Sequence, residues 1–221
     1  MIRVVVVDDQ LLFRAGFCMV LSSQPDLKVV GEAGDGAEAL RLLSRVAADV
    51  VVMDIRMPVM DGVEATRRLC ADNRSDAPRV LVLTTFDTDA DAFAALQAGA
   101  SGFLLKSVPP EELLSAVRAV ASGDAVVAPR ITRRLLDRFA GQFTPRQFDG
   151  SVLDELTERE REVLLLVAQA LSNGEIAAKL HLAETTVKTH VGRMLTKLGL
   201  RDRVQAVVFA YENGLVKPGA P

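Results

Sequence analysis

The chain of 221 residues has no tryptophan, a single tyrosine and only nine phenylalanines, so aromatic side chains contribute little to any core. Its two cysteines, Cys18 and Cys70, are too few for a disulfide framework and fit no metal-ligand spacing. No apolar run reaches the roughly 18 residues of a membrane-spanning helix, and the first apolar stretch is too short for a signal peptide. We therefore expect a cytoplasmic protein with no membrane partner, in which both cysteines are buried as small apolar side chains.

Excess charge of one sign is also missing, because the formal net charge is only -3. Its distribution is uneven, however. Residues 1–124 carry 12 Lys and Arg against 18 Asp and Glu, whereas residues 185–203 carry five basic side chains against Asp202 alone. A local basic stripe of this kind is typical of a nucleic-acid-binding face that a whole-chain sum conceals.

The first half of the chain alternates short apolar runs with amphipathic stretches. Runs rich in Val and Leu, without polar alternation, are typical of parallel strands buried on both faces. They occupy residues 2–7, 27–30, 50–53, 80–83 and 102–105, and the predicted helices occupy residues 11–22, 37–47, 63–71, 89–98 and 110–121. Five such units predict an α/β fold with a doubly wound, five-stranded parallel sheet over residues 1–123.

The pattern changes after Gly123. Residues 124–153 contain several prolines and glycines around a short basic segment, residues 131–139, which predicts a linker with one helix in it. Residues 154–216 then predict a small all-α domain of four helices, at residues 158–170, 173–180, 184–198 and 203–213. Thr157 and Glu160 have the spacing of a capping box at the first of these helices.

Acidic residues follow two of the predicted strands directly. Asp8 and Asp9 come after the first strand and Asp54 comes after the third. If these strands are neighbours, the three carboxylates meet at one edge of the sheet and need a positive partner, either Mg²⁺ or Lys106 after the fifth strand. Thr84 adds a hydroxyl at the same edge. Such a set suits phosphoryl transfer, in which an aspartate can act as the nucleophile.

The segments VVVVDD, VVMDIRMPVMDG, VLTTFD and GASGFLLK together resemble the receiver domain of response regulators, over roughly residues 2–122. The resemblance implies that Asp54 is the phosphoacceptor and that Lys106 pairs with the phosphoryl group. It implies that Mg²⁺ is held by Asp8, Asp9, Asp54 and the backbone carbonyl of Arg56. It also implies a switch pair, Thr84 and Phe103, although many receivers have tyrosine at the second position and phenylalanine lacks that phenol oxygen.

The predicted helices at residues 173–180 and 184–198 have the order and turn length of a helix-turn-helix. On the second helix, Val187, Val191, Met194, Leu195 and Leu198 form an apolar stripe. The opposite face has small polar and basic side chains suited to the major groove of double-stranded DNA. Thr185 and Thr186, near the start of the helix, are placed to contact phosphates.

Residues 156–215 resemble the LuxR-type helix-turn-helix of NarL/FixJ-type response regulators. The resemblance places Lys188, Thr189, Gly192 and Arg193 where that family contacts DNA, and Lys197 near the DNA backbone. Gly192 departs from the family, because a side chain able to reach the groove usually stands there. A glycine inside a helix also costs about 1 kcal/mol relative to alanine.

These features predict a transcription regulator rather than an enzyme. Phosphorylation of Asp54 by a sensor histidine kinase would promote homodimer formation and binding to paired DNA half-sites. Candidate dimer surfaces are the last strand and helix of the α/β domain, its first helix, and the apolar side of residues 203–213 with Val204 and Val208. The competing hypothesis, an aspartate-nucleophile phosphatase or phosphotransferase, expects a second acid two residues after Asp54, where this chain has Arg56. A regulator independent of phosphate would have lost a pocket residue, and none is missing.

Overall fold

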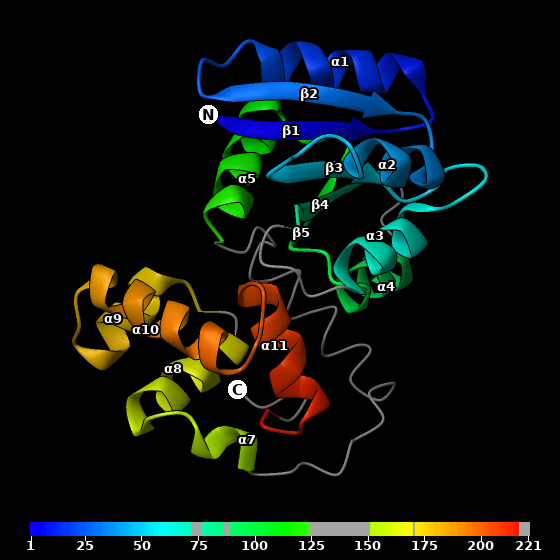
Figure 1. Ribbon diagram of the computed structural model, residues 1–221. Helices are drawn as coiled ribbons and strands as arrows, with labels where there is room; N and C mark the ends of the chain where they lie inside the picture. The colour runs from blue at the N-terminus through cyan, green and yellow to red at the C-terminus, as the bar shows by residue number, and fades with distance from the viewer. Residues whose placement is uncertain (72–76, 86–88, 124–150, 170, 217–221) are drawn as a thin grey trace. The chain divides into compact units, whose positions relative to one another are not determined.

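The computed structural model describes residues 1–71, 77–85, 89–123, 151–169 and 171–216 (Figure 1). The chain divides into two compact units, residues 1–126 and 127–221, and each is described here by itself. The predicted linker at residues 124–153 lies almost entirely outside the described residues, and so does the predicted helix at residues 131–139.

The first unit is built on the five-stranded parallel sheet that the sequence predicts. Its strands lie in the order β2-β1-β3-β4-β5, so β1 and β3 are neighbours. The strands are β1 (Ile2–Val7), β2 (Leu27–Ala33), β3 (Val50–Asp54), β4 (Arg79–Thr84) and β5 (Gly102–Leu105). β2 is three residues longer than predicted, and a register shift between Val4 and Val5 lets it continue past Gly31 beside β1.

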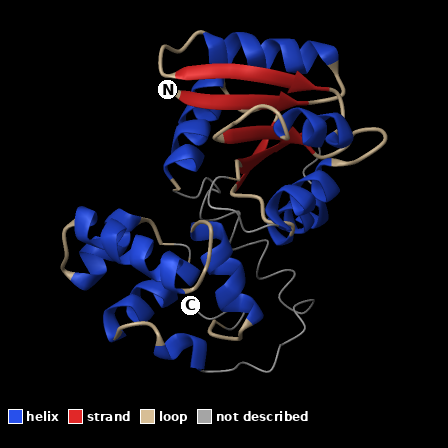
Figure 2. Ribbon diagram, in the orientation of Figure 1, coloured by secondary structure: helices blue, strands red, loops and turns tan. Residues whose placement is uncertain are grey.

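Helices cover both faces of the sheet (Figure 2). One face carries α1 (Leu11–Ser22) and α5 (Pro110–Ser122), and the other carries α2 (Gly36–Leu43), α3 (Gly62–Ala71) and α4 (Asp89–Gln97). The core beneath α1 and α5 is almost entirely aliphatic, as the shortage of aromatics predicts; its buried strand residues are Val4, Val6, Leu27, Val50, Val52, Leu81 and Leu83. Because successive strand residues point to opposite faces, the intervening buried valines and Met53 face α2 to α4.

The second unit is helical throughout its described part. It contains α7 (Ser151–Asp154), α8 (Glu158–Ala168), α9 (Asn173–Leu180), α10 (Glu184–Lys197) and α11 (Arg203–Glu212). The sequence did not predict α7, which is a single turn at the end of the predicted linker. Within the described residues, every helix is too short or too polar to cross a membrane.

Capping residues set where the helices of this unit begin. Thr157 and Glu160 form the predicted capping box at the start of α8. A second box, which the sequence reading missed, joins Ser172 to Glu175 at the start of α9. His181 ends α9 in the left-handed conformation with a φ of 53°, and this reverses the chain before α10.

The two cysteines are half-buried rather than buried. Burial raises the pKa of the Cys18 thiol to about 11, so little thiolate is present at neutral pH. The Cys70 sulfur donates a hydrogen bond to the carbonyl oxygen of Gly99, at 3.4 Å. Both therefore have a packing role in the α/β unit.

Candidate functional site

Three carboxylates meet at the carboxyl edge of the sheet. Asp54 is the last residue of β3, and Asp8 and Asp9 follow β1, the strand beside it. One oxygen from each carboxylate lies within 4.8 Å of the others. Asp8 and Asp54 are buried, whereas Asp9 is exposed. The adjacency of β1 and β3 is therefore what brings together residues that lie 45 positions apart in the chain.

Lys106 enters the same cluster from the residue after β5. Its Nζ lies 2.6 Å from Oδ2 of Asp8 and 3.0 Å from Oδ2 of Asp54, and its side chain is only 2 % exposed. The backbone amide of Lys106 donates to the carbonyl oxygen of Thr84 at 2.8 Å, which fixes the start of this side chain beside the end of β4. The ammonium therefore bridges two buried carboxylates.

Charge in this pocket is unbalanced. Two carboxylates about 4.8 Å apart repel by about 3 kcal/mol at an effective dielectric constant of about 20. Burial raises the pKa of the Asp54 carboxyl, and the Lys106 ammonium beside it acts in the opposite direction. Three carboxylates and one ammonium leave two negative charges, which a divalent cation would balance. Oxygen donors of this kind fit Mg²⁺, which prefers carboxylates completed by water and phosphate oxygens.

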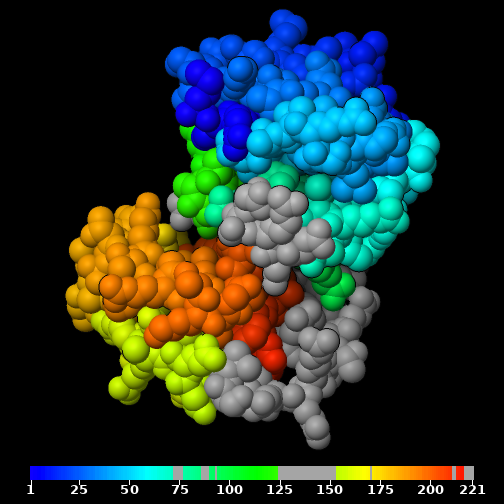
Figure 3. Space-filling view, in the orientation of Figure 1, coloured from blue at the N-terminus to red at the C-terminus, as the bar shows by residue number. Residues whose placement is uncertain are grey.

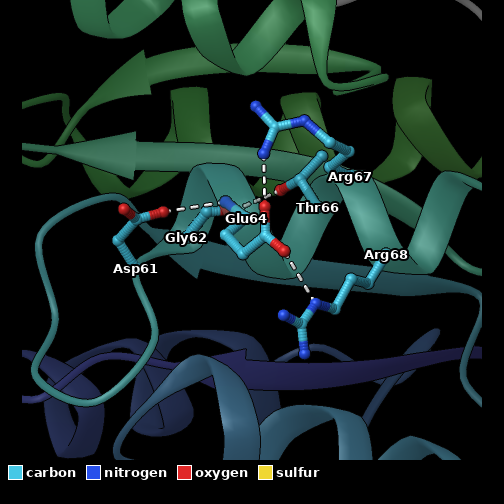
Figure 4. A network of polar contacts seen from close by, with 6 residues as sticks. All are labelled: Asp61, Gly62, Glu64, Thr66, Arg67 and Arg68. Carbon is cyan, nitrogen blue, oxygen red and sulfur yellow. Dashed lines mark hydrogen bonds and ion pairs between the residues drawn. The ribbon is translucent and has the colours of Figure 1, made fainter.

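The loop after Asp54 is fixed by the first turn of α3. Gly62 donates its N–H to the Ile55 carbonyl at 2.8 Å, and a Cβ on Gly62 would lie 1.9 Å from the carbonyl oxygen of Asp54. Asp61 accepts a hydrogen bond from the Glu64 amide at 2.8 Å, while Glu64 pairs with Arg67 and Arg68 further along the helix (Figure 4). Any side chain at position 62 would therefore displace the end of β3.

Arg56, in the same loop, was predicted as a metal ligand through its backbone carbonyl. Its side chain extends to α4, where Nη2 lies 2.9 Å from Oδ2 of Asp91. The sequence reading did not foresee this pair, because the distance between the loop and α4 depends on the packing of α3.

The predicted switch residues lie on the two strands beyond β3. Thr84 is the last residue of β4 and is 1 % exposed. Phe103 is on β5 opposite Val82 and is 4 % exposed, so its ring already points into the protein. Both side chains therefore lie inside the α/β unit, on neighbouring strands that end at the acidic pocket.

The helix α10 has the two faces that the sequence predicts. Val187, Val191 and Met194 are buried against the rest of the helical unit, with Leu195 and Leu198 half-buried beside them. On the other side Thr185, Lys188, Thr189, Gly192 and Arg193 are exposed, and Thr186 is half-buried. A Cβ on Gly192 would meet open space. Figure 3 shows this helix in orange at the surface of the helical unit.

Lys197 differs from the other predicted DNA contacts, because its ammonium is already engaged. Its Nζ lies 2.6 Å from Oε2 of Glu160, which also accepts a hydrogen bond from the Thr157 amide at 2.9 Å. Glu160 is 3 % exposed, and its hydrogen bond with Lys197 lowers the pKa of its carboxyl to about 2. The capping glutamate of α8 thus holds the end of α10.

This arrangement predicts the effect of Glu160→Gln on stability. Glutamine keeps the oxygen that accepts the capping hydrogen bond but loses the negative charge. We therefore expect the free energy of unfolding of the helical unit to fall by about 1–3 kcal/mol at neutral pH, a range kept below that of a fully buried ion pair because Lys197 is partly exposed. The carboxyl has an ordinary pKa of 4.5 when unfolded and about 2 when folded. Its contribution is therefore complete above pH 4.5 and is lost as the pH falls towards 2.

Denaturant unfolding followed by tyrosine fluorescence measures this change, because the only tyrosine, Tyr211, lies in α11. Glu175→Gln is the matched control, since it alters the same capping position in α9 at an exposed carboxylate. Equal losses in the two variants would contradict a specific role for the pair with Lys197.

Two side chains named for one candidate dimer surface are buried within the chain. Val204 and Val208 of α11 are 1 % and 7 % exposed and belong to the core of the chain, where α11 packs on α8. Val204 and Val208 are therefore not exposed in the single chain, unlike the apolar face that their spacing predicts. By contrast, Leu12 and Met19 of α1 are 85 % and 76 % exposed.

Comparison with known families matches each unit separately. Residues 4–118 match the response regulator receiver domain, and residues 154–210 match the bacterial regulatory proteins of the luxR family. The two matches together cover most of the chain, in the order in which the sequence predicts the two domains.

Relatives extend the likeness over the full length. The transcriptional regulatory protein YxjL of Bacillus subtilis (strain 168) is 43 % identical over 220 residues, covering 98 % of both chains. The transcriptional regulatory protein LiaR of the same strain is 39 % identical over 218 residues, covering 98 % of this chain and all of that one. The crystal structure of ChrA, a response regulator of a heme-sensing two-component system, matches 97 % of this chain and 98 % of its own, with 41 % identity and a TM-score of 0.51. These two family matches, together with relatives that are 43 % and 39 % identical over nearly the whole chain, show that it belongs to the two-component response regulators with a receiver domain and a LuxR-type DNA-binding domain.

Proposed function

We propose that Asp54 accepts a phosphoryl group from a sensor histidine kinase and that this event controls DNA binding by the helical domain. The observation that carries the proposal is the buried ammonium of Lys106, 3.0 Å from Asp54 and 2.6 Å from Asp8, in a pocket with two uncompensated negative charges. Such a pocket is suited to a cation and an incoming phosphoryl group. A protein that acts on the bacterial chromosome works in the cytoplasm.

In the transfer, a carboxylate oxygen of Asp54 forms a bond to phosphorus while the bond from phosphorus to the kinase histidine breaks. Mg²⁺ held by Asp8, Asp9, Asp54 and the Arg56 backbone carbonyl would neutralise charge on the phosphoryl group. Lys106 is the resident cation of the pocket, and its bridge between Asp8 and Asp54 places it next to the reacting oxygen. Positioning and charge neutralisation are the main demands of phosphoryl transfer.

Phosphorylation of Asp54 then changes the preferred conformation of the surface over β4 and β5. Phosphorylation adds about -1.5 to -2 charges and several acceptor oxygens, which attract the Thr84 hydroxyl at the end of β4. Movement of Thr84 changes the space available to Phe103 on the neighbouring strand, so the surface over β4 and β5 gains a second state. Phe103 makes this response by packing alone, since it has no hydroxyl.

DNA recognition is assigned to the exposed face of α10. Lys188 and Arg193 carry the charge on this face, and Thr185, Thr186, Thr189 and Gly192 supply a small, polar surface that fits close to a groove. The Thr189 hydroxyl donates to the Thr185 carbonyl at 3.0 Å, which leaves its oxygen available as an acceptor. Lys197 can reach the DNA backbone only by sharing its ammonium with Glu160.

A homodimer on activation completes the proposal, because one recognition helix reads few bases and two-fold pairing doubles them. We expect the wild-type chain to gain mass in solution, from monomer to dimer, when beryllium fluoride supplies a phosphoryl analogue with Mg²⁺. Light scattering measures the mass, and Asp54→Asn is the control that should stay monomeric. A wild-type monomer that binds DNA equally well with and without the analogue would refute phosphorylation control.

A further inference from the structure

Phe13 is an aromatic residue next to the acidic pocket to which the family resemblance gives no role. It lies in the first turn of α1, and its ring centroid is 4.9 Å from the Nζ of Lys106. The chain has only nine phenylalanines and most of its cores are aliphatic, so an aromatic ring at this place calls for a physical explanation.

The ammonium of Lys106 has three N–H donors and almost no contact with water. Two carboxylates, Asp8 and Asp54, approach it at 2.6 and 3.0 Å, and the ring of Phe13 covers a further side. The face of an aromatic ring carries negative potential and attracts a cation within about 6 Å, more strongly when the cation is desolvated. An aliphatic side chain of similar size would fill the same space without this attraction.

The first half of α1 is held against the pocket, so the ring has a defined place. The Arg14 guanidinium donates to the backbone carbonyl of Asp8 and pairs with Glu32 at 3.3 Å. The Phe17 ring, one turn further along α1, stacks on Phe13 with a centroid distance of 6.1 Å and an interplanar angle of 25°. The turn that carries Phe13 is thereby anchored, and its ring has an aromatic neighbour one turn further on, so it can restrain a lysine whose four-carbon stem is otherwise flexible.

We propose that Phe13 is a positioning residue that holds the Lys106 ammonium between Asp8 and Asp54 and thereby sets the rate of phosphoryl uptake at Asp54. This inference rests on the proposed function of Asp54. Without the ring, the Lys106 ammonium samples positions away from the Asp54 carboxylate. It must then return to its place between Asp8 and Asp54 before each phosphoryl transfer, which slows the reaction.

The test compares Phe13→Leu, which removes the ring, with Phe13→Tyr, which keeps it. The first measurement is the rate of phosphoryl uptake from acetyl phosphate with Mg²⁺. We expect Phe13→Leu to be slower by about threefold to tenfold and Phe13→Tyr to match the wild type. The second measurement is the proton NMR signal of the Lys106 ε-methylene, which the ring should shift upfield in the wild type and in Phe13→Tyr but not in Phe13→Leu.

One further variant and a series of three fluorinated analogues separate an electrostatic role from packing. Phe17→Leu removes the stacked neighbour and leaves the ring over Lys106 less restrained, so its uptake rate should fall between that of the wild type and that of Phe13→Leu. Phenylalanine analogues with one, two and three fluorines at position 13 weaken the negative face without shortening the side chain. Uptake should slow with each added fluorine, and this series remains informative if Phe13→Leu folds poorly.

The outcomes distinguish this inference from the proposal beneath it. Equal uptake by the wild type and Phe13→Leu, or a fluorine series with a constant rate, would overturn the positioning role while leaving Asp54 as the phosphoacceptor. Equally slow uptake by Phe13→Leu and Phe13→Tyr would show a packing role and would also overturn it. A wild-type chain that takes up no phosphoryl group would overturn the proposed function and this inference together.

Discussion

We expect the Asp54→Asn variant to take up no phosphoryl group from acetyl phosphate and the wild-type chain to take up one. The reason is that the carboxylate oxygen at the end of β3 is the proposed nucleophile, and an amide in its place is a far weaker one. Intact-mass spectrometry after incubation with Mg²⁺ measures the uptake directly. DNA binding by this variant should then be the same with and without the phosphoryl donor.

The control for this result is Asp26→Asn. Asp26 stands before β2, at the opposite edge of the sheet, and its carboxylate makes a surface pair with Arg118 at 2.7 Å. Phosphoryl uptake by Asp26→Asn should equal that of the wild type. Undiminished uptake by Asp54→Asn would show that another carboxylate, such as the exposed Asp9, is the acceptor.

The same experiment also tests the cation. Three carboxylates share the pocket with one ammonium, so removing divalent ions with a chelator leaves two negative charges facing an anionic donor. We expect chelation to stop uptake by the wild type and added Mg²⁺ to restore it. Asp9→Asn should need more Mg²⁺ to reach the same rate, because this exposed carboxylate is the one not paired with Lys106.

The positions of the pocket residues could be predicted because they depend on topology alone. Buried runs of valine and leucine fix the strands, and side chains that follow parallel strands meet at one edge. The meeting of Asp8, Asp54 and Lys106 could therefore be predicted on the condition that β1 and β3 are neighbours, as they are, and the apolar stripe of α10 could be predicted from its spacing.

Contacts between side chains of different elements could not be predicted in this way. Glu160 and Lys197 lie 37 residues apart, and neither position shows a signal beyond ordinary helix capping and surface charge. In the sequence, Phe13 is indistinguishable from the other apolar residues of an amphipathic helix. In the structure, its ring covers the ammonium of Lys106. Val204 and Val208 have the spacing of an exposed apolar face, yet both are buried. Such outcomes depend on packing angles, which periodicity does not specify.

Removing the charges of the α10 face should weaken DNA binding in two distinguishable ways. Arg193→Ala should lose about 1–3 kcal/mol of binding per recognition helix and relax sequence preference, if its guanidinium reads a base edge. Lys188→Ala should weaken binding to all sequences and flatten the dependence of log affinity on log salt by about one per recognition helix, because it removes one phosphate contact. Both side chains are exposed, so neither change should disturb the fold.

The measurement uses duplexes selected from random sequence by the wild-type protein, titrated over a range of salt concentrations. Lys28→Ala, an exposed lysine on β2 of the receiver domain, is the matched control and should leave the salt slope unchanged. Lys197→Ala should change the slope least among the helix variants and reduce stability instead, since its ammonium is held by Glu160 at 2.6 Å. A Lys188→Ala protein with the wild-type slope would place the DNA on another face, because loss of a phosphate contact must release fewer counterions.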